Sequence, residues 1–228
     1  SGKHKIEITA VDSKNNNGYG QVNLEVTAVP SYIKLDLSGT QIMPGSKVRI
    51  SASLYDQANE LINTSLNLQL ASQKNDKIFD KAVQSGEQLD YEFSQYALPG
   101  QYSLVSTFKG LASQSAINIS TVNGVRVNYQ NESVLVENIG NVLFQDELTF
   151  ILQNELKKYP VVKKISIDPG KILSIDLSKE VPLGIYNVMS PLKEDVGSVK
   201  QIAEEGYQNL LANNVTIHDN RPAYKKIA

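Results

Sequence analysis

The chain of 228 residues contains no cysteine and no tryptophan. Without cysteine there are no disulfide bonds, no thiol nucleophile, no cysteine-ligated zinc and no iron–sulfur cluster, although this absence does not identify a cellular compartment. No apolar run approaches the roughly 18 residues needed to cross a bilayer, and no charged start followed by an apolar core marks a signal peptide. We therefore expect any export signal or membrane tether to lie outside these residues.

The chain also lacks an excess of charge of either sign. It has 22 basic and 24 acidic residues, for a formal net charge of −2, and neither sign is gathered into a block. Because binding to a phosphate backbone needs a concentrated basic face, nucleic acid is not an expected partner. The hydrophobic fraction of 41% and the charged fraction of 20% are ordinary for a globular protein, so we expect each domain to bury a core.

The sequence contains one motif that occurs twice, 84 residues apart. Residues 86–104 read GEQLDYEFSQYALPGQYSL, and residues 170–188 read GKILSIDLSKEVPLGIYNV. Each copy reads as an alternating strand, a turn, and then Gly-x-Tyr at the start of a second alternating strand. The chain is long enough for two ordinary domains, and the repeat predicts two or more.

Period-2 alternation of apolar and polar residues fills most of the chain as far as Pro191. Short runs of this kind, separated by turns rich in Gly, Pro and Asn, are typical of a Greek-key β-sandwich. Beyond Pro191 the period changes to that of an amphipathic helix, with one apolar face formed by Val196, Val199, Ala203, Tyr207 and Leu210. This face is expected to pack on the last sandwich or to contact another subunit, and the tail from Asn213 is expected to be polar and loosely ordered.

Two sets of motifs carry a resemblance to known domains. The run PGSKV at 44–48 heads a predicted strand, and LPGQY at 98–102 follows near the end of the same domain. Together they resemble the immunoglobulin-like modules of bacterial and archaeal surface proteins, and macroglobulin-type domains have a similar pattern. The run VENIGN at 136–141, followed by DPG at 168–170, is similar to the cell-adhesion-related sandwich domains of prokaryotes.

We therefore predict an all-β chain of tandem immunoglobulin-like β-sandwiches with a short C-terminal helix. Residues 1–29 form the terminal hairpin of a partial immunoglobulin-like module, and residues 30–120 form a full sandwich. Residues 121–190 form a compact second β-sandwich, and residues 191–228 form the amphipathic helix and polar tail. The hairpin is expected either to end a preceding module or to pair with the next domain.

The resemblance implies a non-enzymatic role. It suggests an extracellular structural or adhesion module of a prokaryotic cell-surface protein, which serves as an ectodomain spacer or envelope component and has other surface modules or further copies as partners. Two alternatives remain. One is an accessory region of an extracellular enzyme whose catalytic domain lies outside these residues. The other is a carbohydrate- or peptide-binding module, which the absence of tryptophan disfavours.

No catalytic, cofactor-binding or metal-binding residue is predicted. His4 and His218 stand far apart in the sequence with no cluster of ligands near either one. The oxygen-rich loop at 12–18 is of a kind that binds Ca²⁺, but Lys14 occupies a ligand position, so a plain hairpin loop is favoured. We expect Tyr102 and Tyr186 to be structural corners, with the ring buried and the hydroxyl bonded to backbone.

Four Asn-x-Ser/Thr sequons mark candidate glycosylation sites at Asn63, Asn118, Asn131 and Asn214. Chance alone gives nearly as many in a chain of this composition, so they matter only if the protein is exported. Asn63 and Asn131 lie near predicted turns and are the better candidates, whereas Asn118 lies in a predicted strand.

Overall fold

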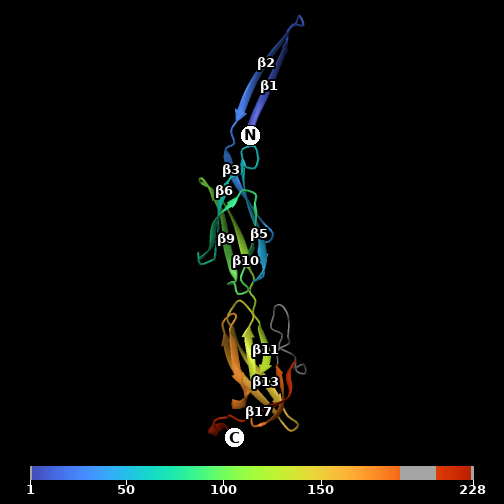
Figure 1. Cartoon of the computed structure of the whole chain (residues 1–228), viewed down its shortest axis with the longest axis vertical. Helices are drawn as coiled ribbons and strands as arrows, with labels where there is room; N and C mark the ends of the chain where they lie inside the picture. Colours follow the sequence, from blue (N-terminus) through green and yellow to red (C-terminus); the bar gives the residue numbers. More distant parts are fainter. Residues whose placement is uncertain (1, 191–208, 227–228) are drawn as a thin grey trace. The chain divides into compact units, whose positions relative to one another are not determined.

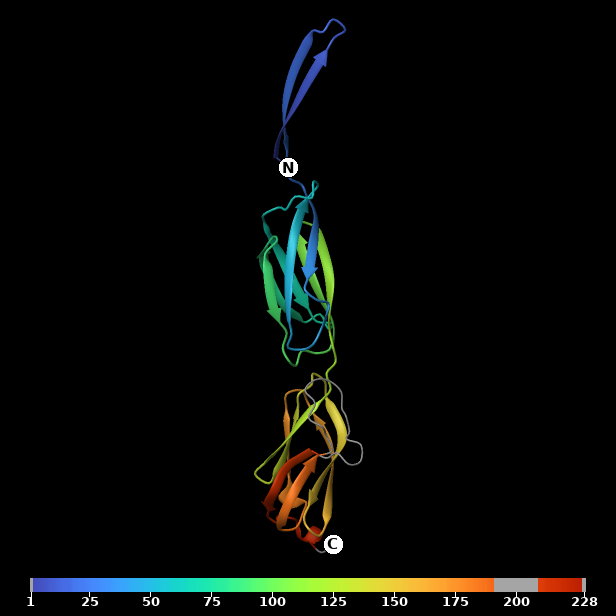
Figure 2. The same ribbon diagram turned by 90° about the vertical axis from the view of Figure 1, so that its right-hand side faces the viewer.

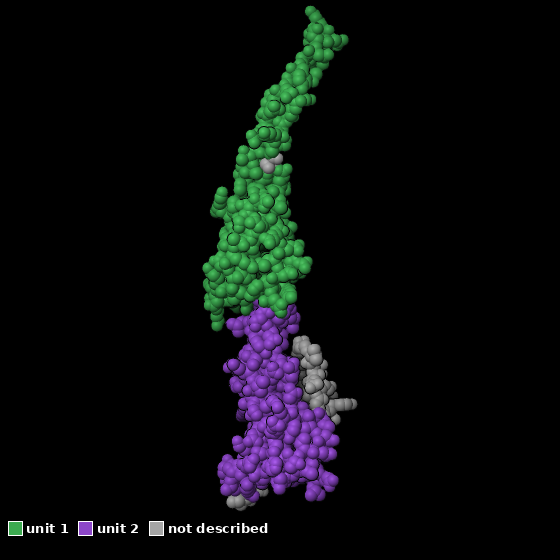
Figure 3. Space-filling view, in the orientation of Figure 1, with its two compact units in different colours: residues 1–42, 47–92, 101–118 green, residues 43–46, 93–100, 119–228 purple. Residues whose placement is uncertain are grey.

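The computed structural model describes residues 2–190 and 209–226, and these residues are almost entirely strands and turns. The predicted all-β sandwich class is confirmed. The chain divides into two compact units, one of residues 1–42, 47–92 and 101–118 and the other of residues 43–46, 93–100 and 119–228 (Figure 3). Within the described ranges, no helix is long and apolar enough to cross a membrane.

The first unit begins with a hairpin of β1 (Gly2–Val11) and β2 (Asn17–Val26), whose strands pair only with one another among the described strands (Figure 1). A sandwich follows. One sheet has the order β3-β5-β8, with β3 at Pro30–Leu37, β5 at Lys47–Asp56 and β8 at Gln88–Glu92. The other has the order β4-β10-β9-β6-β7, with β4 at Gln41–Ile42, β6 at Ser65–Ala71, β7 at Lys77–Gln84, β9 at Gly100–Phe108 and β10 at Leu111–Ile119.

The second unit is a sandwich of two smaller sheets. The first has the order β11-β12-β15, with β11 at Val125–Gln130, β12 at Ser133–Asn138 and β15 at Ile172–Asp176. The second has the order β14-β13-β16-β17, with β13 at Phe144–Gln153, β14 at Lys158–Ile167, β16 at Gly184–Ser190 and β17 at Asn209–Ile217 (Figure 2). A 3-10 turn, η1 (Leu177–Lys179), joins β15 to β16, and α1 (Ala223–Lys226) lies near the C-terminus.

Alternation builds both cores, because successive side chains of a strand point to opposite faces. In β5 the inward residues Val48, Ile50, Ala52 and Leu54 are fully buried. In the second unit the two sheets share one apolar cluster, to which β12 contributes Val136 and β13 contributes Phe150. Burying each such side chain contributes about 1.5–3 kcal/mol, so these rows are the main source of stability in each sandwich.

The repeat seen in the sequence is present in the structure. Both β8 and β15 are five-residue strands, and they stand 84 residues apart, as do the starts of β9 and β16. The glycines that begin the two copies, Gly86 and Gly170, both have positive φ, which a residue without a Cβ adopts at little cost. The repeated motif thus encodes a strand, a turn and a second strand in each sandwich.

The C-terminal part of the chain differs from the prediction. The amphipathic helix falls mainly on residues 191–208, which lie outside the described residues, but Leu210 belongs to β17. The tail expected to be loosely ordered from Asn213 is also part of β17, which pairs with β16. Two register shifts interrupt this pairing, and the extra residues of a bulge break the alternation that reveals a strand.

Candidate functional site

The β1–β2 hairpin has an exposed apolar face. Ile6 pairs with Val22 and His4 with Leu24, so the apolar side chains of both strands share one face of the ribbon. We call this face, made up of Ile6, Ile8, Ala10, Val22, Leu24 and Val26, the apolar hairpin face. Ile6 is 46% and Val22 is 49% exposed. A contiguous apolar patch of this kind is a candidate interaction surface.

The opposite face of the same hairpin is polar. It carries Lys3, Lys5 and Glu7 from β1 and Gln21, Asn23 and Glu25 from β2. The Nζ of Lys5 also forms an ion pair with Glu7. Such a division into one apolar and one polar face is typical of an antiparallel sheet in a sandwich, which packs one face on the core and exposes the other to solvent. A two-stranded hairpin is only marginally stable by itself in water, so the apolar face needs a cover.

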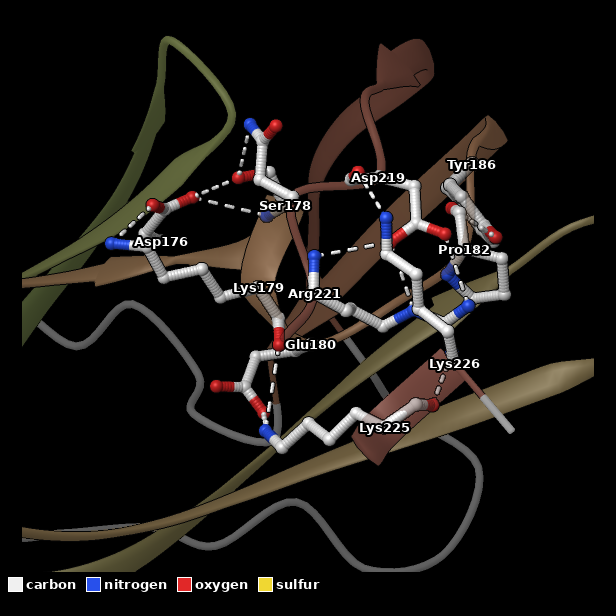
Figure 4. Close-up of polar contacts among 11 residues, drawn as sticks. Asp176, Ser178, Lys179, Glu180, Pro182, Tyr186, Asp219, Arg221, Lys225 and Lys226 are labelled. Carbon is white, nitrogen blue, oxygen red and sulfur yellow. Dashed lines mark hydrogen bonds and ion pairs between the residues drawn. The ribbon is translucent and has the colours of Figure 1, made fainter. Parts of the chain in front are cut away.

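A polar cluster fixes the end of the chain to the second sandwich (Figure 4). We call the contacts of residues 218–226 with Glu132 and residues 176–182 the C-terminal clasp. Within the C-terminal segment, Arg221 donates from Nε and Nη2 to the two carboxylate oxygens of Asp219, both at 3.0 Å, and so shapes the segment that the other contacts join to the sandwich. Lys225 donates to Glu180 at 2.9 Å, and the backbone N–H of Asn220 donates to the Ser178 carbonyl at 2.9 Å. The bidentate pairing of Arg221 with Asp219 fixes the geometry of this segment as well as neutralising its charge.

The clasp lowers the pKa values of its carboxyls. The guanidinium of Arg221 lowers the pKa of Asp219 from 3.8 to about 2. Partial burial raises the pKa of Glu180, but the hydrogen bonds from Lys163 and Lys225 outweigh it, so that the net pKa shift is downward. The backbone N–H and the imidazole of His218 lower the pKa of Glu132. Each carboxylate of the clasp is therefore held in its charged form by a cation or donor, which suits anchoring.

We expect acid to loosen the clasp in a defined range. A group whose folded pKa is depressed contributes stability above its unfolded pKa and loses it as the pH falls through the folded value. For Asp219 this range runs from about pH 4 down to about pH 2. The protection factors of the β17 amides, which correct for the intrinsic pH dependence of amide exchange, should therefore fall across this range in the parent protein, and the extra protection relative to Asp219→Asn should shrink toward zero. A difference between the two proteins that stays constant with pH would contradict the assignment.

Two fully buried asparagines hold the opposite end of the second unit. The Nδ2 of Asn138 donates to the carbonyls of Val142 at 2.8 Å and Ile167 at 2.7 Å, while its Oδ1 accepts from Gly140 N–H at 2.9 Å. The Oδ1 of Asn141 accepts from Val122 N–H at 2.7 Å. Buried amides with all these bonds made rigidify a turn, and they are costly to remove. The motif Asn-Ile-Gly-Asn at 138–141 is thus a structural centre.

The two Gly-x-Tyr tyrosines lie at equivalent places in the two sandwiches. Tyr102 is buried in β9. Tyr186 is buried in β16, its hydroxyl donates to the Pro182 carbonyl at 3.0 Å, and its ring meets that of Tyr159 edge-on. A bond from tyrosine hydroxyl to backbone a few residues upstream is the bond that a tyrosine corner makes. A Cβ at position 184 would lie 3.0 Å from the Tyr186 ring, which explains the glycine of the motif.

The sequons occupy different environments. Asn63 is exposed and lies outside the strands, and Asn131 is exposed in the turn between β11 and β12 with φ of 47°. Asn118 lies in β10, where its Nδ2 donates to Gln41. Asn214 is exposed on β17 with φ of 50°. Glycosylation at any of these sites remains a prediction, and Asn63 and Asn131 are favoured because they lie outside the strands, whereas Asn118 and Asn214 lie in β10 and β17.

Asp12 and His218 have structural partners. In the β1–β2 loop the Asp12 carboxylate accepts from the backbone N–H of Lys14 at 2.7 Å and of Asn16 at 2.9 Å, so its oxygens shape the turn. The Nδ1 of His218 lies 2.7 Å from Glu132 in the clasp, whereas His4 lies on the hairpin. In the part of the chain that the structure describes, no group of three or more His, Asp or Glu side chains is placed to hold a metal ion.

Sequence reasoning missed the clasp and the two buried asparagines as centres. The clasp joins residues more than 40 positions apart, such as Lys225 and Glu180, and no local pattern signals such a pairing. The asparagines did give a signal, since Asn-x-Gly-Asn follows a strand. That pattern reports a turn, however, and cannot show that the amides are buried.

Comparison with known proteins gives no family. No protein-family model matches the chain, and no curated protein matches it. Among solved structures, the chain is similar to Salmonella alpha-2-macroglobulin reacted with methylamine, with 11% identity over 95% of this chain and 19% of that chain and a TM-score of 0.36.

Two further solved structures are similar at the same level. The native conformation of E. coli alpha-2-macroglobulin matches with 10% identity over 82% of this chain and 17% of that chain, with a TM-score of 0.36. A DUF4785 family protein from Legionella pneumophila matches with 14% identity over 92% of this chain and 62% of that chain, with a TM-score of 0.28. The chain spans less than two thirds of each of these proteins, and likeness at these TM-scores carries nothing about function.

Proposed function

We propose that this chain is a non-enzymatic spacer in the ectodomain of a prokaryotic cell-surface protein, where its sandwiches connect other modules in series. The observation that carries the proposal is the path of the chain. In each sandwich the polypeptide arrives at one end and departs from the other. Compact domains often have their termini close together, so this arrangement suits modules that are joined end to end.

The path through the first sandwich follows from strand pairing. The chain arrives at Pro30, the start of β3, which lies opposite Asp56 at the end of β5. Leu37, at the far end of β3, lies opposite Ile50. The chain departs after Ile119, and the preceding Asn118 donates its N–H to the Thr40 carbonyl just beyond β3. The point of departure is therefore at the far end of β3.

The path through the second sandwich has the same form. The chain arrives at Val125, which lies opposite Asn138 at one end of β12. The other end of β12, at Ser133, lies opposite Asp176, and the clasp that holds residues 218–226 is built on Glu132 and residues 176–182. The buried asparagines thus secure the end where the chain arrives, and the clasp secures the end where it departs. A module under tension needs both ends fixed to its core.

Cell-surface location is tested with a tag in the exposed turn at Lys109–Gly110. Antibody to the tag should label intact cells of the natural host, while a cytosolic marker stays unlabelled until the cells are permeabilised. Labelling that requires permeabilisation would contradict the proposed location.

The spacer role is tested by exchange of a module. In the natural full-length protein, the readout is the binding or adhesion that intact cells show through that protein. Deletion of residues 30–120 should reduce this activity, and an unrelated β-sandwich of similar length inserted at that place should restore it. Restoration is expected because a spacer contributes reach rather than specific contacts. Failure of the unrelated sandwich, with restoration only by residues 30–120 themselves, would favour a binding module.

A further inference from the structure

The β1–β2 hairpin has a structural counterpart in the same chain. Both hairpins start at a glycine with an unusual backbone, φ of 124° at Gly2 and 119° at Gly100. Starting from these glycines, His4, Ile6 and Ile8 fall at the positions of Tyr102, Leu104 and Ser106 in β9. In the second strands, Leu24 and Val26 correspond to Ile117 and Ile119, the last two inward residues of β10.

The two hairpins differ in what covers them. Tyr102, Leu104 and Ser106 are buried in the first sandwich, as are Ile117 and Ile119, because the β3-β5-β8 sheet packs against this face. The corresponding residues of β1 and β2 are all exposed. The apolar hairpin face thus has the pattern of a sandwich core without the opposing sheet.

We infer that the β1–β2 hairpin is the last pair of strands of another sandwich, and that an apolar sheet encoded ahead of it in the same polypeptide covers the apolar hairpin face. The order of elements supports a partner in the same chain. In the first sandwich the equivalent hairpin also comes last, and a short connection leads from β10 to β11 in the next module. The connection from β2 to β3 is also short, and Gln57 holds it through bonds to Val29 N–H and the Thr27 carbonyl.

The covering segment should resemble the part of the first sandwich that packs against β9 and β10. It should be about as long as residues 30–99, the part of the first sandwich that precedes β9, and it should consist of alternating strands. One sheet should present an apolar face to Ile6, Val22 and Leu24. Another strand should pair with the free edge of β1, because β6 pairs with the corresponding edge of β9.

Hydrogen exchange tests the inference. The gene product extended to include the residues encoded before Ser1 is compared with the 228-residue chain, with the amides of residues 2–11 and 17–26 as the readout. In the extended protein these amides should be protected at least about 100-fold more than in the shorter chain, since an isolated hairpin opens readily. A gene that encodes no such strands before Ser1, or equal protection in the two proteins, would overturn the inference.

A matched pair of variants identifies the face. In the extended protein, Ile6→Lys places a charge on the apolar hairpin face and should remove most of the added protection, whereas Thr9→Lys places the same charge on the polar face and should change it less than about 3-fold. Equal effects of the two variants would overturn the assignment. The oligomeric state is followed by sedimentation at the concentrations used for exchange. Protection of the hairpin that appears only where the extended protein self-associates would also overturn the inference, because a second copy would then be the cover.

Discussion

Gly140→Ala is expected to prevent the second unit from folding stably. A Cβ at this position would lie 2.3 Å from the Val122 carbonyl oxygen and 3.2 Å from the Asn123 Cα, both backbone atoms. The Val122 backbone cannot easily retreat, because its carbonyl accepts from Asn141 N–H at 3.0 Å and its N–H donates to the Asn141 side chain at 2.7 Å. Relief of the clash would break these buried bonds, so we expect a loss of about 4 kcal/mol or more.

Gly124→Ala is the matched control for this prediction. Gly124 lies in the same contact between residues 122–124 and residues 139–141, since its carbonyl accepts from Ile139 N–H. A Cβ there would meet only the Ile139 side chain, at 3.8 Å, which is ordinary contact. Urea unfolding followed by amide exchange should show the second unit destabilised by Gly140→Ala and nearly unchanged in Gly124→Ala, with β3 to β7 unaffected in both. A stable second unit in Gly140→Ala would show that the Val122 turn is not fixed.

Asn138→Ala should have the second largest effect. The substitution removes two bonds from the amide nitrogen and one to the amide oxygen, and it leaves the Val142 and Ile167 carbonyls and the Gly140 N–H without this partner. Because Asn138 is fully buried, water cannot replace the amide without a cavity rearrangement. Each buried group left unsatisfied costs about 1–3 kcal/mol, and we expect a total loss of about 3–5 kcal/mol.

Asn138→Asp tests the amide donor separately from the shape of the side chain, and Asn128→Ala is the control for an exposed asparagine. The aspartate keeps the shape of the side chain but replaces the donor by a carboxylate at neutral pH, so it should be at least as destabilising as alanine. Asn128 is an exposed residue of β11, and its replacement by alanine should cost less than about 0.5 kcal/mol. The free energy of unfolding of the second unit is the readout. A loss below about 1 kcal/mol for Asn138→Ala would contradict the bonding described above.

The strands of both sandwiches could be predicted where local alternation was intact. The row Val48, Ile50, Ala52 and Leu54 shows its buried face directly, because each side chain of a strand faces opposite to the next. The motif repeated at an offset of 84 residues also located the glycines that begin and divide each copy. These are short-range features, and short-range sterics and solvation decide them.

The C-terminal strand could not be predicted in this way. In β17 the side chains of Leu210, Leu211, Asn213 and Asn214 do not alternate, since the bulges opposite β16 insert extra residues. Asn214 also has a positive φ, which is unusual inside a strand. Pairing with residues 19 to 33 positions earlier stabilises this segment, and no short window of the sequence contains both partners.

The sequence by itself determined the all-β class, the repeated strand, turn and strand unit, and the division of the first hairpin into an apolar and a polar face. Only the tertiary structure decided that Asn138 and Asn141 are buried centres, that Lys225 and Glu180 join the C-terminal segment to the second sandwich, and that each sandwich passes the chain from one end to the other. The reason is physical. Alternation depends on neighbouring residues, whereas burial of an amide and pairing of distant charges depend on which strands the fold brings together.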